Sequence, residues 1–259
     1  MPTVISFAPN RDRRSVIIGL KHLLRPTDTV AKPGVLTFDL PAIDDYLPQG
    51  GLSLGALHDI VSETAELPAA FGFAIALISR LARSGPVLIV ISPTTLLSGR
   101  IYGHGLNTIG LEPERVLLVE AGDQIQAHWV IEEALKSKAP AAIAAIAGAD
   151  PDLKTSRRLH LAAGKAGLPL LLLRPGAKGK ASAAMTRWRI GTAQAARDRF
   201  DLLKAWRWRL VLERCRNGRP GEWSVEFDHD THRFSLAHAM ADRTFPQSAV
   251  AQSLARRSG

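Results

Sequence analysis

Arginine and tryptophan residues alternate in the second half of this 259-residue sequence, and they are its first candidates for chemistry. They do so in Arg187-Trp188-Arg189 and again in Trp206-Arg207-Trp208-Arg209. Guanidinium and ammonium groups bind phosphates, and aromatic rings stack on unpaired bases. We therefore predict weak, salt-sensitive, sequence-independent binding of single-stranded DNA through Lys178, Lys180, Arg187, Arg189, Arg207, Arg209, Arg214, Arg216 and Arg219.

The charge of the chain is concentrated where these residues lie. The formal charge is +9, yet residues 34–150 sum to −7 and residues 151–220 sum to +13. Such a distribution favours a polyanionic partner at one place on the surface. On alternating strands, Arg207 and Arg209 would share one face while Trp206 and Trp208 share the other. The alternative is therefore that the tryptophans pack in the core and the arginines are only solvated.

Short apolar strands and helical stretches must position these residues. We expect strands at 56–61, 87–91, 116–119, 142–147 and 168–173, and helices at 68–83, near 97–106, at 124–138 and at 153–165. Near-continuous apolar strands separated by helices are typical of a parallel sheet covered on both faces, a doubly wound α/β core. Beyond a loop at 175–182, we expect a strand at 186–190 and an antiparallel hairpin formed by 206–214 and 222–227.

The ends of the chain differ from this core, which we place at residues 34–239. The sequence pattern predicts a basic arm with a short amphipathic helix at residues 1–33 and a loosely held tail at residues 240–259. A small apolar helix outside a core usually docks either on the body of the same chain or on a partner. Our candidates for contact with a partner or a second copy are Arg13, Arg14, Ile17, Leu20 and Leu24. Without a signal-peptide pattern or an apolar run of about 20 residues, a cytoplasmic protein with no membrane contact is expected.

Cysteine and histidine residues offer little catalytic chemistry. The single cysteine, Cys215, excludes an internal disulfide and a zinc site of several cysteines, and no nucleophile, base and orienting group recur together around the histidines. We expect neither a metal nor a cofactor. Arg214 and Arg216 flank Cys215 and should lower its pKa.

A glycine-rich turn gives the first resemblance to a known group of proteins. The segment 47–60, LPQGGLSLGALHDI, resembles the entry to the ATPase core of the RecA superfamily, where a Gly-Gly-Leu turn precedes the first strand. This resemblance implies a RecA-like fold and places a phosphate-binding loop, Gly-x-x-x-x-Gly-Lys-Ser/Thr, directly after that strand. It also places Lys178, Lys180, Arg187 and Arg189 at a DNA-contacting loop.

The expected phosphate-binding loop has lost its diagnostic residues. Ser62 and Leu67 stand in place of the glycines, Pro68 in place of the lysine, and Ala69 in place of the hydroxyl that binds magnesium. Such a loop needs consecutive backbone N–H groups, a cation and a hydroxyl to hold a nucleotide, and proline has no N–H. We therefore predict no ATP hydrolysis and no enzymatic activity.

The later segments 153–159, 183–189 and 214–223 narrow the resemblance to the bacterial ImuA family, over about three quarters of the chain. The family implies a damage-inducible (SOS) accessory factor in mutagenic translesion DNA synthesis. It would bind ImuB, a Y-family-like polymerase subunit without catalysis, and act with an error-prone C-family polymerase; RecA, single-stranded DNA and a second copy of the chain are further candidate partners.

Two alternatives stay open. A SulA-like cell-division inhibitor would also keep a RecA-like fold without the nucleotide site, but it would not need the basic hairpin. A diverged RecA-type ATPase would use an unusual site around residues 62–69.

Overall fold

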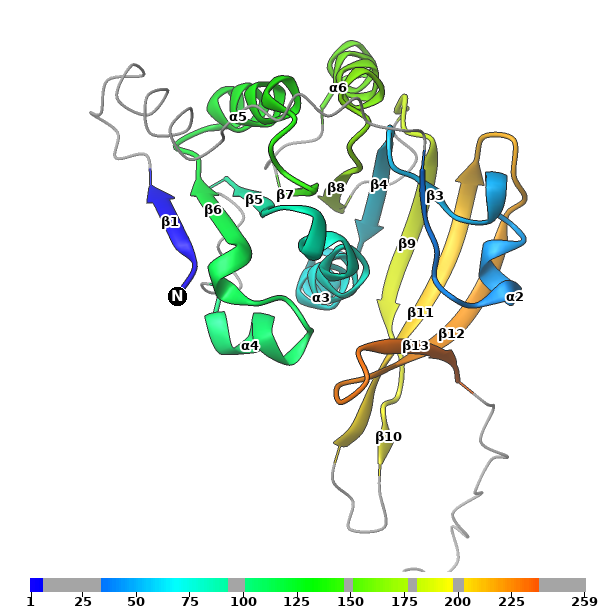
Figure 1. Ribbon diagram of the computed structural model, residues 1–259. Helices are drawn as coiled ribbons and strands as arrows, with labels where there is room; N and C mark the ends of the chain where they lie inside the picture. Colours follow the sequence, from blue (N-terminus) through cyan, green and yellow to red (C-terminus); the bar gives the residue numbers. More distant parts are fainter. Residues whose placement is uncertain (7–33, 93–100, 147–150, 177–180, 198–202, 238–259) are drawn as a thin grey trace, which may run out of the picture.

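The computed structural model describes residues 1–6, 34–92, 101–146, 151–176, 181–197 and 203–237, and most of its strands form one mixed sheet (Figure 1). Across the sheet the order is β1 (Thr3–Ser6), β6 (Val116–Glu120), β5 (Val87–Ile91), β7 (Ala142–Ile146), β8 (Leu170–Pro175), β4 (Leu57–Ser62), β9 (Thr186–Thr192), β11 (Leu203–Cys215), β12 (Gly221–Asp228) and β13 (Arg233–Leu236). Strand β10 (Ala196–Arg197) pairs with β11 outside this order. Neighbours from β1 to β9 are parallel, and neighbours from β9 through β11 and β12 to β13 are antiparallel.

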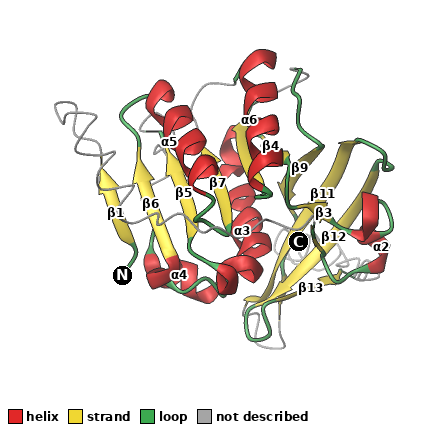
Figure 2. Cartoon of the chain, turned by 45° about the horizontal axis from the view of Figure 1, so that its top comes forward, coloured by secondary structure: helices red, strands yellow, loops and turns green. Residues whose placement is uncertain are grey.

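Helices cover both faces of the parallel part of the sheet. Helix α3 (Leu67–Ile78) lies on one side, and α5 (Gln124–Ser137) and α6 (Leu153–Ala166) lie on the other (Figures 1 and 2). Every residue of β4, β5 and β7 is buried, which explains why β5 and β7 are continuous apolar runs rather than alternating ones. Asp123 and Asp152 cap α5 and α6 by accepting hydrogen bonds from the backbone N–H groups of Gln126 and Thr155.

The most apolar helical stretch is a core element. Thr64–Ala82 has the length and mean hydropathy, 1.4, of a membrane-spanning segment, but 56% of it is buried inside the fold. Phe73, Ile75 and Ile78 of α3 are fully buried against the sheet. Its apolar composition therefore follows from its central position between the parallel strands and the C-terminal aromatic residues.

The Gly-Gly turn serves a close approach of two backbones. Strands β2 (Val35–Leu36) and β3 (Leu52–Ser53) form a separate two-stranded sheet, with the short helix α2 (Pro41–Asp44) and a turn at Pro48–Gly50 between them. A Cβ atom on Gly51 would lie 2.9 Å from the Leu36 carbonyl oxygen, and Gly50 has a φ of +75°. Both positions therefore need glycine, and together they direct the chain into β4.

The predicted α/β architecture, with a mainly parallel sheet and an antiparallel C-terminal extension, is confirmed. Several details differ. Among the described residues, the helix expected near 97–106 lies at Gly103–Thr108. The helix expected to reach residue 83 ends at Ile78 and is followed by the 3-10 helix Ser79–Ser84. The strand expected from residue 168 begins at Leu170, after Pro169, because proline has no N–H to donate. The sequence also did not predict β1, β10 or β13, and residues 3–6 had been assigned to the basic arm.

Several predictions concern residues outside the described part of the chain. They are the partner-contact residues Arg13, Arg14, Ile17, Leu20 and Leu24, the DNA-contact residues Lys178 and Lys180, and the tail at 240–259.

Candidate functional site

The loop with the lost phosphate-binding residues connects β4 to α3 at the carboxyl edge of the parallel strands. This is the edge at which open α/β sheets usually bind ligands. Ser62 ends β4 and is buried, Leu67 begins α3 and is buried, and Pro68 lies exposed in the first helical turn with Ala69 beside it. The Ser62 hydroxyl has no hydrogen-bond partner among the described residues.

A carboxylate from this connection binds the end of the neighbouring strand β9. Glu66 Oε1 accepts hydrogen bonds from the backbone N–H of Thr192, at 3.0 Å, and from the Thr192 hydroxyl, at 3.1 Å. The backbone N–H of Gly176 donates to the Ser62 carbonyl oxygen at 2.8 Å. The connection is thus fastened to β9 and to the end of β8 by its own side chain and backbone. Glu66 thus places a carboxylate in this connection, where a phosphate-binding loop would present hydrogen-bond donors.

An apolar pocket of about 540 Å³ opens beside this connection. Its walls come from α3, from the helix α4 (Gly103–Thr108) and the residues before it, from the carboxyl ends of β5 and β7, and from β11. The described lining residues include Leu67, Phe71, Tyr102, Leu106, Trp206 and Trp208. Size and composition are typical of a site for an apolar group.

The tryptophans of the basic segments belong mainly to the core. Trp188 and Trp208 are buried and Trp206 is half-buried, within an aromatic cluster that also contains Phe73 and Phe227. Trp206 and Trp208 lie on the α3 side of the sheet, whereas Arg207 and Arg209 face the other way to pair with glutamates of β12. This confirms the predicted separation of faces and favours the core role for the tryptophan rings.

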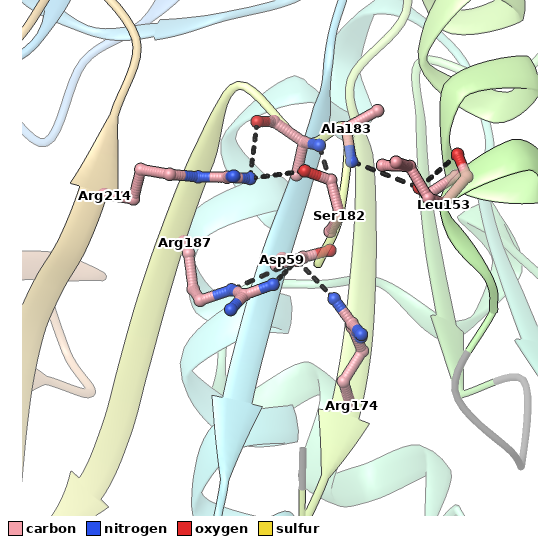
Figure 3. A network of polar contacts seen from close by, with 9 residues as sticks. Asp59, Leu153, Arg174, Ser182, Ala183, Arg187 and Arg214 are labelled. Carbon is pink, nitrogen blue, oxygen red and sulfur yellow. Dashed lines mark hydrogen bonds and ion pairs between the residues drawn. The ribbon is translucent and has the colours of Figure 1, made fainter. Parts of the chain in front are cut away.

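Asp59 is the centre of a buried polar cluster on the α6 side of the sheet (Figure 3). Its Oδ2 atom accepts hydrogen bonds from Arg174 Nη1 at 2.6 Å and Arg187 Nη2 at 3.1 Å. Arg214 donates to the carbonyl oxygens of Ser182 and Ala184. Burial, followed by the charge of the Arg187 guanidinium, lowers the pKa of Arg214. Because Arg187 pairs with the fully buried carboxylate of Asp59, its guanidinium group has a structural role.

The other predicted DNA-contact residues that the structure describes lie on the C-terminal strands and the turn between β11 and β12. Arg189 pairs with Glu213 at 2.5 Å, Arg209 with Glu222 at 2.6 Å, and Arg207 with Glu226. Arg219 stacks on the Tyr46 ring, with its guanidinium carbon 4.5 Å from the ring centroid, and Arg216 is exposed. Because the glutamates lie on neighbouring strands, this sheet face carries less net charge than the sum over residues 151–220 indicated.

A second polar chain is buried on the α3 side. His58 Nε2 contacts the Ser53 carbonyl oxygen at 2.9 Å, and His58 Nδ1 contacts the Thr186 hydroxyl at 2.8 Å. The same hydroxyl accepts a hydrogen bond from Trp188 Nε1 at 3.0 Å. All three contacts are satisfied when the imidazole is neutral and protonated on Nε2. Burial lowers the pKa of His58 to about 4.

One pKa prediction was wrong, and three residues with structural roles were missed. Burial raises the pKa of Cys215 rather than the flanking arginines lowering it. The roles of Asp59, Arg174 and Glu66 were not predicted, although a charged residue inside or at the end of an apolar strand is a signal of a buried ion pair. Among the described residues, no group of three or more His, Cys, Asp or Glu side chains is placed to hold a metal ion.

Comparison with known proteins identifies relatives over most of the chain. No protein-family model matches the chain. Protein ImuA from Caulobacter vibrioides, strain NA1000 / CB15N, is 36% identical over 228 residues, which cover 80% of this chain and 91% of the relative. Protein ImuA from strain ATCC 19089 / CIP 103742 / CB 15 of the same species matches equally. Identity at this level over most of both sequences shows that the chain belongs to the ImuA family.

Proposed function

We propose that this protein is a non-catalytic, RecA-like accessory factor in damage-induced mutagenic translesion DNA synthesis. It acts in the cytoplasm by binding a Y-family-like polymerase subunit of the ImuB type, together with an error-prone C-family polymerase, and by contacting single-stranded DNA. Membership of the ImuA family supports the link to this mutagenesis system. The position of β4 within the parallel sheet, after the Gly-Gly turn, supports the RecA-like assignment.

The observation that carries the proposal is the chemistry of the connection between β4 and α3. A nucleotide triphosphate needs donors and cations at this place. The connection instead carries Glu66, held by Thr192, and Pro68, and it borders an apolar pocket. These features favour association with protein surfaces over nucleotide turnover.

Affinity purification from cells exposed to DNA damage tests the proposed partner. The full-length chain should retain an ImuB-type polymerase subunit, and the same pair, purified separately and mixed, should co-elute without added ATP. Recovery of a tubulin-like division protein in place of the polymerase subunit would support the SulA-like alternative and contradict the proposal.

A further inference from the structure

We propose that the outer face of helix α6 is a docking surface for an acidic amphipathic helix of a partner protein. This face consists of Lys154, Arg157, Arg158, Leu161 and Lys165. The helix lies on the outside of the parallel sheet, next to α5 (Figures 1 and 2). Segment 153–159, at its start, is one of the three that carry the resemblance to the ImuA family, yet the function proposed above gives it no role.

A leucine stands at the centre of the outer face. The side of α6 that packs against the sheet is formed by the buried residues Ser156, Leu159, Ala163 and Ala166. At 3.6 residues per turn, Leu161 lies on the opposite side of the helix, and it is 58% exposed. A single exposed leucine is common on protein surfaces, so its surroundings decide what it can do.

Four cations surround this leucine. Lys154, Arg157 and Arg158 lie seven, four and three residues before Leu161, and Lys165 lies four residues after it. A helix brings residues at these spacings onto one side. All four cations are exposed, and α6 contains no aspartate or glutamate. The outer face is therefore a positively charged stripe with an apolar centre.

Most of this charge has no counter-charge within the described part of the chain. Arg158 Nε pairs with Glu132 Oε1 of α5 at 2.6 Å. Lys154, Arg157 and Lys165 form no ion pair with any residue that the structure describes. Like charges on neighbouring turns of a helix repel one another. Negative groups of a partner would therefore be attracted to this stripe.

The apolar centre favours a protein partner over a nucleic acid. A phosphate backbone would neutralise the cations, but it offers no apolar side chain to cover Leu161. A helix with an apolar side chain opposite Leu161, and with Asp or Glu three or four residues to either side, would both bury the leucine and pair with the cations. Burial of apolar area adds affinity, and the charges select an acidic partner.

A synthetic peptide tests this surface in the full-length protein. The labelled probe is about 18 residues long, so that it can form a helix, with leucines on one side, glutamates beside them and alanine elsewhere. It should bind more tightly than a peptide of the same composition whose leucines are spread around the helix. Leu161→Ser should weaken binding about tenfold, because the apolar contact is lost. The matched control Val4→Ser changes an exposed apolar residue of β1 and should leave binding unchanged.

A charge substitution tests the cations of the stripe. Arg157→Gln should weaken peptide binding about threefold and should flatten its dependence on salt, whereas Lys136→Gln on α5 should change neither. Each substituted side chain is exposed, so unchanged thermal midpoints will show that the variants fold.

Three results would overturn the proposal. The first is equal affinity of Leu161→Ser and the unaltered protein for the peptide. The second is no preference between the two peptides. The third is an Arg157→Gln variant that loses affinity for single-stranded DNA while its affinity for the peptide is unchanged, because that would assign the stripe to a nucleic acid.

Discussion

At the scale of single residues, strand β4 holds two adjacent polar side chains that the fold accommodates differently. Burial keeps His58 neutral, and its two ring nitrogens contact the Thr186 hydroxyl and the Ser53 carbonyl oxygen. Asp59 pairs with the guanidinium groups of Arg174 and Arg187. Both sets of contacts fasten β4 to β9, so they are expected to contribute to stability rather than to catalysis.

The neutral His58 makes stability depend on pH. Because burial lowers its pKa to about 4 from 6.5, the unfolded chain binds a proton between these values that the folded chain does not. The stabilisation is complete above pH 6.5 and is lost as the pH falls towards 4, by up to about 3 kcal/mol. Urea unfolding at several pH values measures this loss.

The variant His58→Gln isolates that contribution. It should be less stable at neutral pH, yet its free energy of unfolding should fall less steeply between pH 6.5 and pH 4. Identical slopes for the variant and the unaltered protein would show that His58 is not the titrating group.

Removing the Asp59 carboxylate should be more damaging at neutral pH. Asp59→Asn leaves two buried guanidinium groups without their shared counter-charge, which typically costs about 3–5 kcal/mol. Glu222→Gln, which breaks the exposed pair with Arg209, is the control and should leave the thermal midpoint unchanged. Similar midpoints for both variants would contradict the structural role given to Asp59.

At the scale of elements, the Glu66 carboxylate helps to hold the connection between β4 and α3 against β9. Glu66→Ala removes the acceptor of the Thr192 N–H and hydroxyl, so the Thr192 amide should exchange faster with solvent. Glu66→Gln keeps a carbonyl oxygen in the same place and should retain most of the protection. NMR-detected hydrogen exchange distinguishes the two variants, and equal protection in both would show that Glu66 does not hold the connection.

Elements with a strong local pattern could be predicted from the sequence. The continuous apolar runs of β5 and β7 and the Asp-capped helices α5 and α6 were placed to within a residue or two. The edge strands β1 and β13 are four residues long and lack that pattern, because only one neighbour stabilises each. The arginine–glutamate pairs could not be predicted from the sequence either, because Arg207 lies opposite Glu226 only through the register of β11 against β12.

At the scale of the whole molecule, the structure changes how DNA binding should be tested. Reversing the charge of Arg187 would disturb the buried Asp59, so a loss of binding in that variant would not report on DNA. Lys178 and Lys180 offer a cleaner test. If each contacts a phosphate, Lys178→Ala/Lys180→Ala should reduce the slope of log affinity for single-stranded DNA against log salt by about 1.4.

Lys136→Ala is the matched control for that pair of substitutions. Lys136 is an exposed lysine at the end of α5, outside the predicted DNA-contact residues, and its removal should leave the slope unchanged. Fluorescence anisotropy with labelled single-stranded DNA measures both. An unchanged slope in the double variant would remove Lys178 and Lys180 from the interface.

The central claim is that this protein binds the phosphates of DNA and does not bind those of ATP. It is tested most directly by titrating labelled single-stranded DNA over a salt series, with and without magnesium and ATP, while measuring phosphate release. We predict an affinity that falls as salt rises, the same binding curves with and without ATP, and no phosphate release. Curves shifted by ATP, or turnover abolished by substitutions at residues 62–69, would contradict it.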